Sequence, residues 1–202
     1  MKYPKFFDEV KPLKLYDPLS EILGTFEDGV MEINYIDIVK FAGHSCPTVA
    51  GAYLMTQEAL KYLYPNSLPV RGEIKVEFRD KQSDGVVGVK ANVIENITGA
   101  SDKRGFKGLN GKFARADLLS FEKDIVGEVR FSRVDNGKYC DIEYDPSSIP
   151  SNPKMSHLMQ KMMQNLASKE EKSEFGSLWQ DRVNEILLNS SKYPDLIKLS
   201  VL

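Results

Sequence analysis

The sequence has few of the features that mark secreted, membrane or nucleic-acid-binding proteins. Its 202 residues include only two cysteines, two histidines and one tryptophan. Cys46 and Cys140 can form at most one disulfide, whereas small secreted proteins usually depend on several. Lys plus Arg number 27 and Asp plus Glu 29, a formal net charge of −2. The chain as a whole therefore has no attraction for nucleic acid or an anionic membrane.

Long apolar runs are also missing. The first residues, Met1–Asp8, are too polar to contain the apolar stretch of about 7–15 residues found in a signal peptide. The longest weakly apolar run, Val49–Met55, is far shorter than the roughly 20 residues of a membrane-spanning helix. We therefore expect a cytoplasmic protein with free thiols and with neither membrane nor nucleic-acid partners.

What the chain does contain is the composition of an ordinary folded protein. Apolar residues make up 42% and charged residues 28%, which excludes disorder along the whole chain. The clearest helix is expected from Pro47 to Tyr64, where apolar residues recur at steps of three and four. Shorter helices are expected after Asp17, which can cap a helix that starts at Pro18, and over Ile36–Phe41.

Alternating apolar residues and turn signals predict an antiparallel sheet. The strictest alternation is in Glu73–Arg79, and Asp135-Asn136-Gly137 is a strong hairpin signal between two strands. The predicted strands are Met31–Tyr35, Glu73–Arg79, Gly85–Ile97, Ala116–Phe121, Ile125–Val134 and Lys138–Tyr144. The long helix would cover the apolar face of this sheet, which makes the fold α+β.

The composition changes at Asp145–Pro153, which holds three prolines in nine residues and is interpreted as a linker. Two helices are expected after it, over Lys154–Ala167 and Glu170–Leu188. The chain is therefore divided into an α+β domain, residues 1–145, which holds both candidate sites described below, and a linker with a C-terminal helical extension, residues 146–202. Four methionines at helical steps suit core packing or a dimer surface; they are Met155, Met159, Met162 and Met163.

The first candidate site is Gly43-His44-Ser45-Cys46-Pro47. Pro47 suits the first turn of a helix, which places Cys46 at its cap, where unpaired amide N–H groups and the helix dipole favour a thiolate. In extended backbone, His44 points to the same side as Cys46. An imidazole and a thiolate together suit Zn²⁺ or another divalent transition metal. Two alternatives stay open: a structural cysteine with a polar cap, and a Cys–His nucleophile pair.

The second candidate site is the glycine-rich segment Thr98–Arg115, which has five cationic side chains and one acidic one. Glycines let backbone N–H groups turn inward, and the cations add charge, as in an anion-binding loop. The alternative is a mobile, solvated loop. The candidate anion- or substrate-binding residues are Thr98, Lys103, Arg104, Lys107, Lys112 and Arg115. Cys140, in a predicted strand, is interpreted as structural.

The segment Phe41–Tyr53, with its Gly-His-x-Cys-Pro core and its small residues, resembles the FmdE-like family, which is named for a component of formylmethanofuran dehydrogenase. Ile97-Thr98-Gly99 resembles a second landmark of that family. The resemblance implies an α+β fold with a mixed or antiparallel sheet, frequent dimerisation, and a metal, usually zinc, held by His44 and Cys46. Family members often add a cysteine from the sheet, and Val89 and Ala100 stand in that neighbourhood here.

The leading functional hypothesis is a homodimeric protein that binds a metal, zinc in the first place. It would suit a small metal-dependent enzyme acting on an anionic small molecule. A third ligand would then come from a carboxylate, from Cys140 or from a second subunit. Two alternatives are kept. One is a non-catalytic accessory or assembly subunit of a redox enzyme complex, and the other is a thiol enzyme that uses Cys46 without metal.

Overall fold

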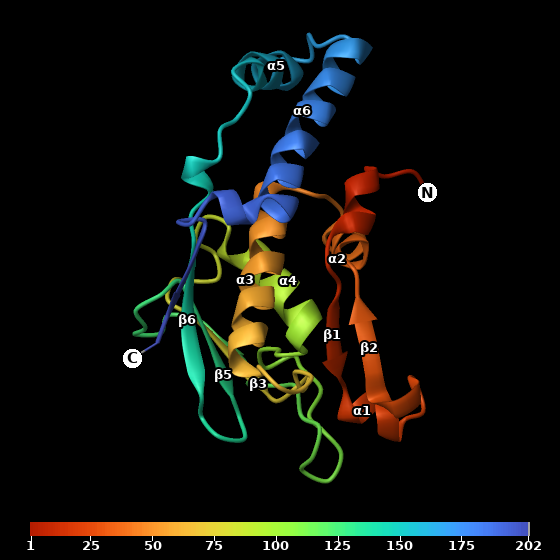
Figure 1. Cartoon of the computed structure of the whole chain (residues 1–202), viewed down its shortest axis with the longest axis vertical. Coiled ribbons are helices and arrows are strands. Elements are labelled where there is room, and N and C mark those ends of the chain that lie inside the picture. Colours follow the sequence, from red (N-terminus) through yellow and green to blue (C-terminus); the bar gives the residue numbers. More distant parts are fainter. Residues whose placement is uncertain (202) are drawn as a thin grey trace.

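A five-stranded mixed sheet forms one side of the structure, a computed structural model that describes residues 1–201 (Figure 1). Its strand order is β4-β3-β5-β6-β7. The β3–β4 pair is parallel, and the other three pairs are antiparallel. The strands are β3 (Ile74–Phe78), β4 (Leu119–Ser120), β5 (Val129–Arg133), β6 (Tyr139–Tyr144) and β7 (Ile197–Ser200). This sheet, covered by helices, confirms the α+β fold class.

The centre of this sheet follows the local sequence closely. In β3 the residues Ile74, Val76 and Phe78 are fully buried on one face, as strict alternation requires. Strands β5 and β6 form the predicted hairpin around Asp135–Gly137, with Phe131 opposite Cys140. Cys140 is fully buried, and burial raises the pKa of its thiol to about 12, which fits the structural role predicted for it.

A second, two-stranded sheet is formed by β1 (Leu13–Tyr16) and β2 (Val30–Ile33), with α1 (Pro18–Ile22) between them in the chain. Asp17 caps α1 through hydrogen bonds from the Leu19 and Ser20 amides, as predicted. The predicted strand Met31–Tyr35 ends early, at Ile33, because Asn34 is the N-cap of α2 (Tyr35–Ala42). Two short 3-10 helices, Lys5–Glu9 and Glu27–Gly29, complete this part.

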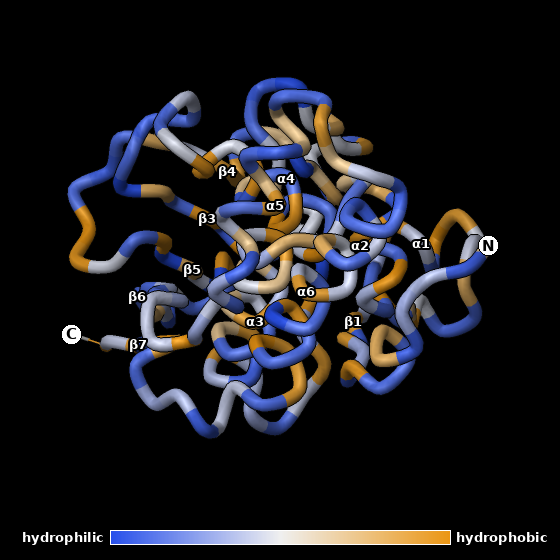
Figure 2. Tube along the Cα trace, turned by 90° about the horizontal axis from the view of Figure 1, so that it is seen from above, coloured by the Kyte–Doolittle hydropathy of each residue, from blue (hydrophilic) through white to orange (hydrophobic). Residues whose placement is uncertain are grey.

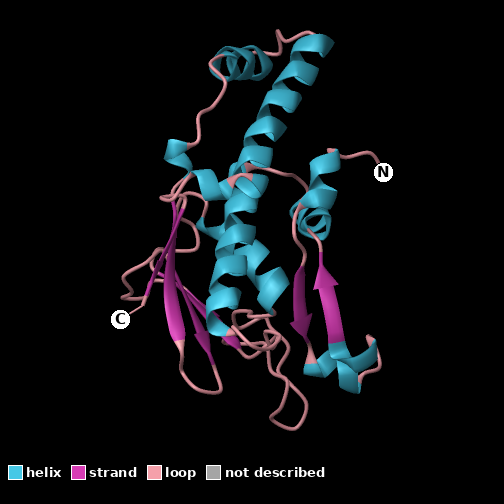
Figure 3. Ribbon diagram, in the orientation of Figure 1, coloured by secondary structure: helices cyan, strands magenta, loops and turns pink. Residues whose placement is uncertain are grey.

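Two central helices lie between the sheets (Figure 3). They are α3 (Pro47–Leu63), the predicted long helix, and α4 (Val87–Thr98). Helix α3 packs on β6, β5 and β7 and against α4. Hydrophobic and hydrophilic segments alternate along the helices in Figure 2, as expected where a helix buries one face. None of the helices described in residues 1–201 has the length and hydropathy needed to cross a membrane.

The prediction of a strand over Gly85–Ile97 is wrong, because this segment forms α4. Its β-branched residues favour a strand, but its buried positions follow a helical spacing, with Val87, Ala91, Ile94 and Ile97 on one face. Gly99 ends the helix in the left-handed conformation, with φ 72°. The predicted strand Ala116–Phe121 is likewise reduced to the two residues of β4.

The C-terminal part contains α5 (Lys154–Met163) and α6 (Lys169–Leu188), both expected, and short 3-10 helices at Pro146–Ser148 and Ser190–Lys192. The hairpin of α5 and the first half of α6 projects from the body (Figure 1). The second half of α6 packs on α3 and buries Val183, Ile186 and Leu187 in the common core. Strand β7, which the sequence patterns do not predict, then pairs with β6 at one edge of the large sheet.

Candidate functional site

The turn between α2 and α3 carries His44 and Cys46. Helix α2 ends at Gly43 with φ 78°, and Cys46 is extended, with φ −148° and ψ 168°, as the N-cap of α3. Pro47 takes the first helical position, where its missing N–H leaves no hydrogen bond unmade. The local sequence thus places a cysteine at the N-terminus of a 17-residue helix.

The Cys46 side chain is half-buried, and it packs against the edge of the core. Its Sγ accepts a hydrogen bond from the Val49 backbone N–H, with an N···S distance of 3.4 Å. This donor is one of the amides that a helix leaves without an internal partner at its first turn. A negative charge on Sγ would be stabilised by the same N–H group and by the helix dipole, as a metal-binding thiolate requires.

His44 is exposed, and its ring orientation is set by its own turn. Its Nδ1 lies 3.0 Å from the Ala42 carbonyl oxygen. Since a carbonyl oxygen can only accept, Nδ1 must carry the proton. In the tautomer that carries its proton on Nδ1, the lone pair is on Nε2. Metal-binding histidines typically have one ring nitrogen held by a hydrogen bond in this way.

Ser45, the residue between these two side chains, is held from two helices. Its carbonyl oxygen accepts hydrogen bonds from Trp179 Nε1 and Gln180 Nε2 of α6, both at 3.1 Å. Its Oγ lies 2.9 Å from the Tyr35 hydroxyl of α2. Burial raises the pKa of Tyr35 far above its usual range, so this hydroxyl keeps its proton. Sequence reasoning missed these three partners, because their separations in the chain leave no local signal.

Tyr144, at the end of β6, fixes the first turn of α3 from the sheet side. Its hydroxyl donates to the Pro47 carbonyl at 2.8 Å. Its ring lies so close to Gly51 that a Cβ there would come within 2.3 Å of it. Lys90 Nζ, which is paired with Glu128, lies 5.3 Å from the centroid of the same ring. No pattern in the sequence indicates that this tyrosine supports the motif.

The donor types at this turn fit zinc, but their number within one chain does not complete a site. Among residues 1–201 no three or more His, Cys, Asp and Glu side chains are grouped so as to hold a metal ion. Ala100 is buried and offers no donor side chain, and neither does Val89. His44 and Cys46 would therefore hold a metal together with solvent, a bound ligand or a donor from a second chain.

The cationic segment lies near the opposite end of α3 from His44 and Cys46 (Figure 1). Some of its cations are already engaged within the segment. Arg104 forms an ion pair with Asp102 at 2.8 Å, and Lys107 Nζ donates to the Lys103 carbonyl at 2.6 Å. The structure thus places Lys103, Arg104, Lys107 and Lys112 on a surface loop, and one chain does not bring them to the His44–Cys46 turn.

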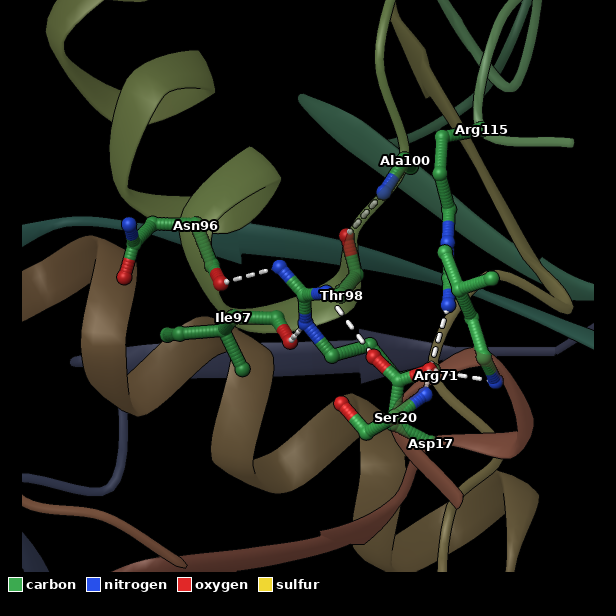
Figure 4. Close-up of polar contacts among 9 residues, drawn as sticks. Asp17, Ser20, Arg71, Asn96, Ile97, Thr98, Ala100 and Arg115 are labelled. Carbon is green, nitrogen blue, oxygen red and sulfur yellow. Dashed lines mark hydrogen bonds and ion pairs between the residues drawn. The ribbon is translucent and has the colours of Figure 1, made fainter. Parts of the chain in front are cut away.

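The other two candidates of this segment, Thr98 and Arg115, are buried inside the fold (Figure 4). Arg115 Nη2 lies 2.6 Å from Asp17 Oδ1, and Arg71 Nη1 lies 3.0 Å from Asp17 Oδ2. Thr98 Oγ1 donates to the Ile94 carbonyl and accepts from the Ala100 N–H. Arg71 also donates to the Asn96 and Ile97 carbonyls, which ties the cap of α1 to the end of α4. Thr98 and Arg115 are thus engaged in contacts inside the fold.

Comparison with known proteins gives a family match over most of the chain. The family model described as "FmdE, Molybdenum formylmethanofuran dehydrogenase operon" matches residues 41–193. The matched range begins just before the Gly43–Pro47 turn and continues through the large sheet as far as β6 and through α5 and α6. A search of curated proteins gave no match.

Proposed function

The chain belongs to the FmdE family, and we propose that it binds a divalent transition metal, zinc in the first place, through His44 and Cys46. The proposal rests on the observation that nearby backbone groups hold both donor side chains by hydrogen bonds. The Val49 N–H donates to Cys46 Sγ, and the Ala42 carbonyl holds the His44 ring through Nδ1, which leaves the lone pair of the neutral ring on Nε2. Both hydrogen bonds are formed within residues 42–49, between the end of α2 and the first turn of α3.

Bound zinc would supply a Lewis acid with open coordination positions. The residues of the chain would hold and orient it: Cys46 as a thiolate at the helix start, and His44 through Nε2. For a catalytic role we propose an anionic small molecule as the ligand of an open position. A homodimer in the cytoplasm is the proposed assembly and location, supported by two free cysteines and by a candidate site at which residues 1–201 group fewer than three donor side chains.

Metal analysis tests this function directly. Purified protein, loaded with zinc and dialysed, is expected to retain equimolar zinc by mass spectrometry of the elements. His44→Ala and Cys46→Ala should lose it, because each removes one of only two donors. The second histidine and the second cysteine provide matched controls, so His157→Ala and Cys140→Ala should retain the metal. Equal zinc content in all five proteins would contradict the proposal.

Alkylation of Cys46 distinguishes the proposed metal site from the alternative of a thiol enzyme. A metal-bound thiolate is protected from iodoacetamide until a chelator strips the metal, whereas a free reactive thiol is labelled at the same rate with or without the chelator. Cys140 serves as the internal reference, because it is fully buried in the sheet. Rapid labelling of Cys46 at a rate that the chelator does not change would favour the thiol enzyme.

An accessory role is the second candidate, and the projecting α5–α6 hairpin favours it. Met163 and Leu166, at the tip of this hairpin, are 71% and 69% exposed. Exposed apolar side chains on a projecting element suit contact with another protein. The description of the matching family, which refers to a formylmethanofuran dehydrogenase operon, supports a place beside a redox enzyme. This role is compatible with metal binding, since the hairpin tip and the His44–Cys46 turn are different surfaces.

A further inference from the structure

The contact between α6 and the Ser45 carbonyl joins the C-terminal extension to the candidate metal ligands. Two consecutive residues of α6, Trp179 and Gln180, both donate to this one oxygen, at 3.1 Å each. They lie 134 and 135 residues away from it in the chain. Since Ser45 stands between His44 and Cys46, the peptide bond that they hold is the one leading into Cys46.

These two hydrogen bonds occupy both lone pairs of the Ser45 carbonyl oxygen. A carbonyl oxygen has two lone pairs, the indole N–H can only donate, and the side-chain amide must turn its NH₂ toward a carbonyl. The hydroxyl of Tyr35, in α2, lies 2.9 Å from Ser45 Oγ and holds this side chain by a hydrogen bond. Ser45 is therefore fixed at its carbonyl and at its hydroxyl, and rotation of its peptide plane would break both hydrogen bonds to α6 at once.

The helix that carries these donors is itself well anchored. Val183, Ile186 and Leu187 are buried in the core shared with α3. One end of α6 thus sits firmly on the body of the molecule, the other end continues into the projecting hairpin, and Trp179 and Gln180 lie between these two parts. Their placement relative to the turn is set by tertiary packing.

We propose that Trp179 and Gln180 are positioning residues for the metal ligands: by holding the Ser45 carbonyl, they fix the backbone that aims His44 and Cys46 at one ion. This inference rests on the proposed metal site. Neither residue is a ligand. Removal of groups that orient metal ligands typically weakens metal binding about 10- to 100-fold. The C-terminal extension would then belong to the metal site.

Cobalt(II) is the probe, because a cobalt–thiolate bond gives a charge-transfer band and the visible bands report coordination geometry. The full chain, freed of metal, is titrated with cobalt as wild type, Trp179→Phe, Gln180→Met and the double variant. Each variant keeps the bulk of its side chain and loses its donor. We expect the double variant to bind cobalt about 10- to 100-fold more weakly, with shifted visible bands.

Ile74→Val is the control, because it shortens a fully buried side chain of β3, which is part of neither α6 nor the His44–Cys46 turn. It should lower stability and leave the cobalt affinity and spectrum unchanged. Wild-type spectra and affinity in the double variant would overturn the inference, as would equal losses in the double variant and the control. Absence of a cobalt–thiolate band in the wild type would instead overturn the metal site itself, and the inference with it.

Discussion

A single carboxylate, Asp17, connects three distant parts of the chain. It accepts hydrogen bonds from the first amides of α1 and pairs with both Arg71 and Arg115 (Figure 4). Its side chain is only 4% exposed. Burial alone would raise the pKa of Asp17, but Arg115, Arg71 and the Ser20 amide outweigh it and hold the pKa below its usual value. Asp17 is thus charged when folded, even in mild acid.

Asp17→Asn is expected to destabilise the protein by about 3–5 kcal/mol at neutral pH, because it leaves two arginines without their shared partner. The pKa of Asp17 is lower in the folded state than in the unfolded state. The ionised carboxylate therefore stabilises the fold fully above the unfolded pKa of about 3.9, and this stabilisation is lost as the pH falls through the folded pKa. Urea unfolding from pH 7 to pH 2.5 checks this: the difference between wild type and variant should narrow below about pH 4.

Asp135→Asn is the matched control for this prediction. Asp135 also pairs with an arginine, Arg133, at 2.5 Å, but its side chain is 44% exposed. An exposed pair contributes about 0–1 kcal/mol, so this variant should lose far less stability. A gap between wild type and Asp17→Asn that stays constant down to pH 2.5 would show that the stabilisation does not come from the ionised carboxylate.

Among the helices, α3 carries a glycine where helix propensity alone would prefer alanine. Gly51 lies in the second turn, and the Tyr144 ring occupies the space that a side chain would need. The same ring bears the hydroxyl that holds the Pro47 carbonyl. The small residue therefore lets the sheet approach the helix closely, directly behind the turn that carries Cys46.

Gly51→Ala is expected to destabilise the protein by about 1–3 kcal/mol, despite alanine's higher helix propensity, because the new Cβ would overlap the Tyr144 ring. Gly176→Ala, in α6, is the opposite case, since nothing lies within 4 Å of the position that its Cβ would take. It should stabilise by up to about 1 kcal/mol. Thermal unfolding of both variants measures whether each substitution lowers or raises the stability. If both substitutions stabilise the protein, Tyr144 moves aside freely.

Across the complete fold, the C-terminal extension shares the core of the N-terminal part. Helix α6 buries Val183, Ile186 and Leu187 against the body, and β7 adds a strand to the large sheet. A boundary at residue 146 therefore divides elements that pack on one another. Removing residues 151–202 would also remove β7 and these buried side chains, so point substitutions are the cleaner way to study the extension.

The chain is accordingly expected to unfold in one cooperative transition. Trp179 is the only tryptophan and lies at the contact between α6 and Ser45. Its fluorescence should therefore change at the same urea concentration as the far-ultraviolet circular dichroism of the whole fold. Val183→Ala should move both transitions together to lower urea. A fluorescence transition that precedes the dichroism change would show that the extension unfolds by itself.

Several elements could be predicted from the amino-acid sequence because their signals are local. Helix α3, the β5–β6 hairpin and the Asp17 cap belong to this group, since spacing, turn residues and capping side chains act within a few residues. The same holds for Cys46 at a helix start, which Pro47 marks. Family membership was also predictable, from the segment Phe41–Tyr53 and its Gly-His-x-Cys-Pro core.

How these elements meet depends instead on packing in three dimensions. The β-branched residues of α4 suit either a strand or a helix, and packing against α3 selects the helix. The contacts of Ser45 with α6 and the buried pairing of Arg115 with Asp17 join residues about 100 or more positions apart. Local preferences cannot specify such partners, because the path of the chain between them determines which polar groups are buried together.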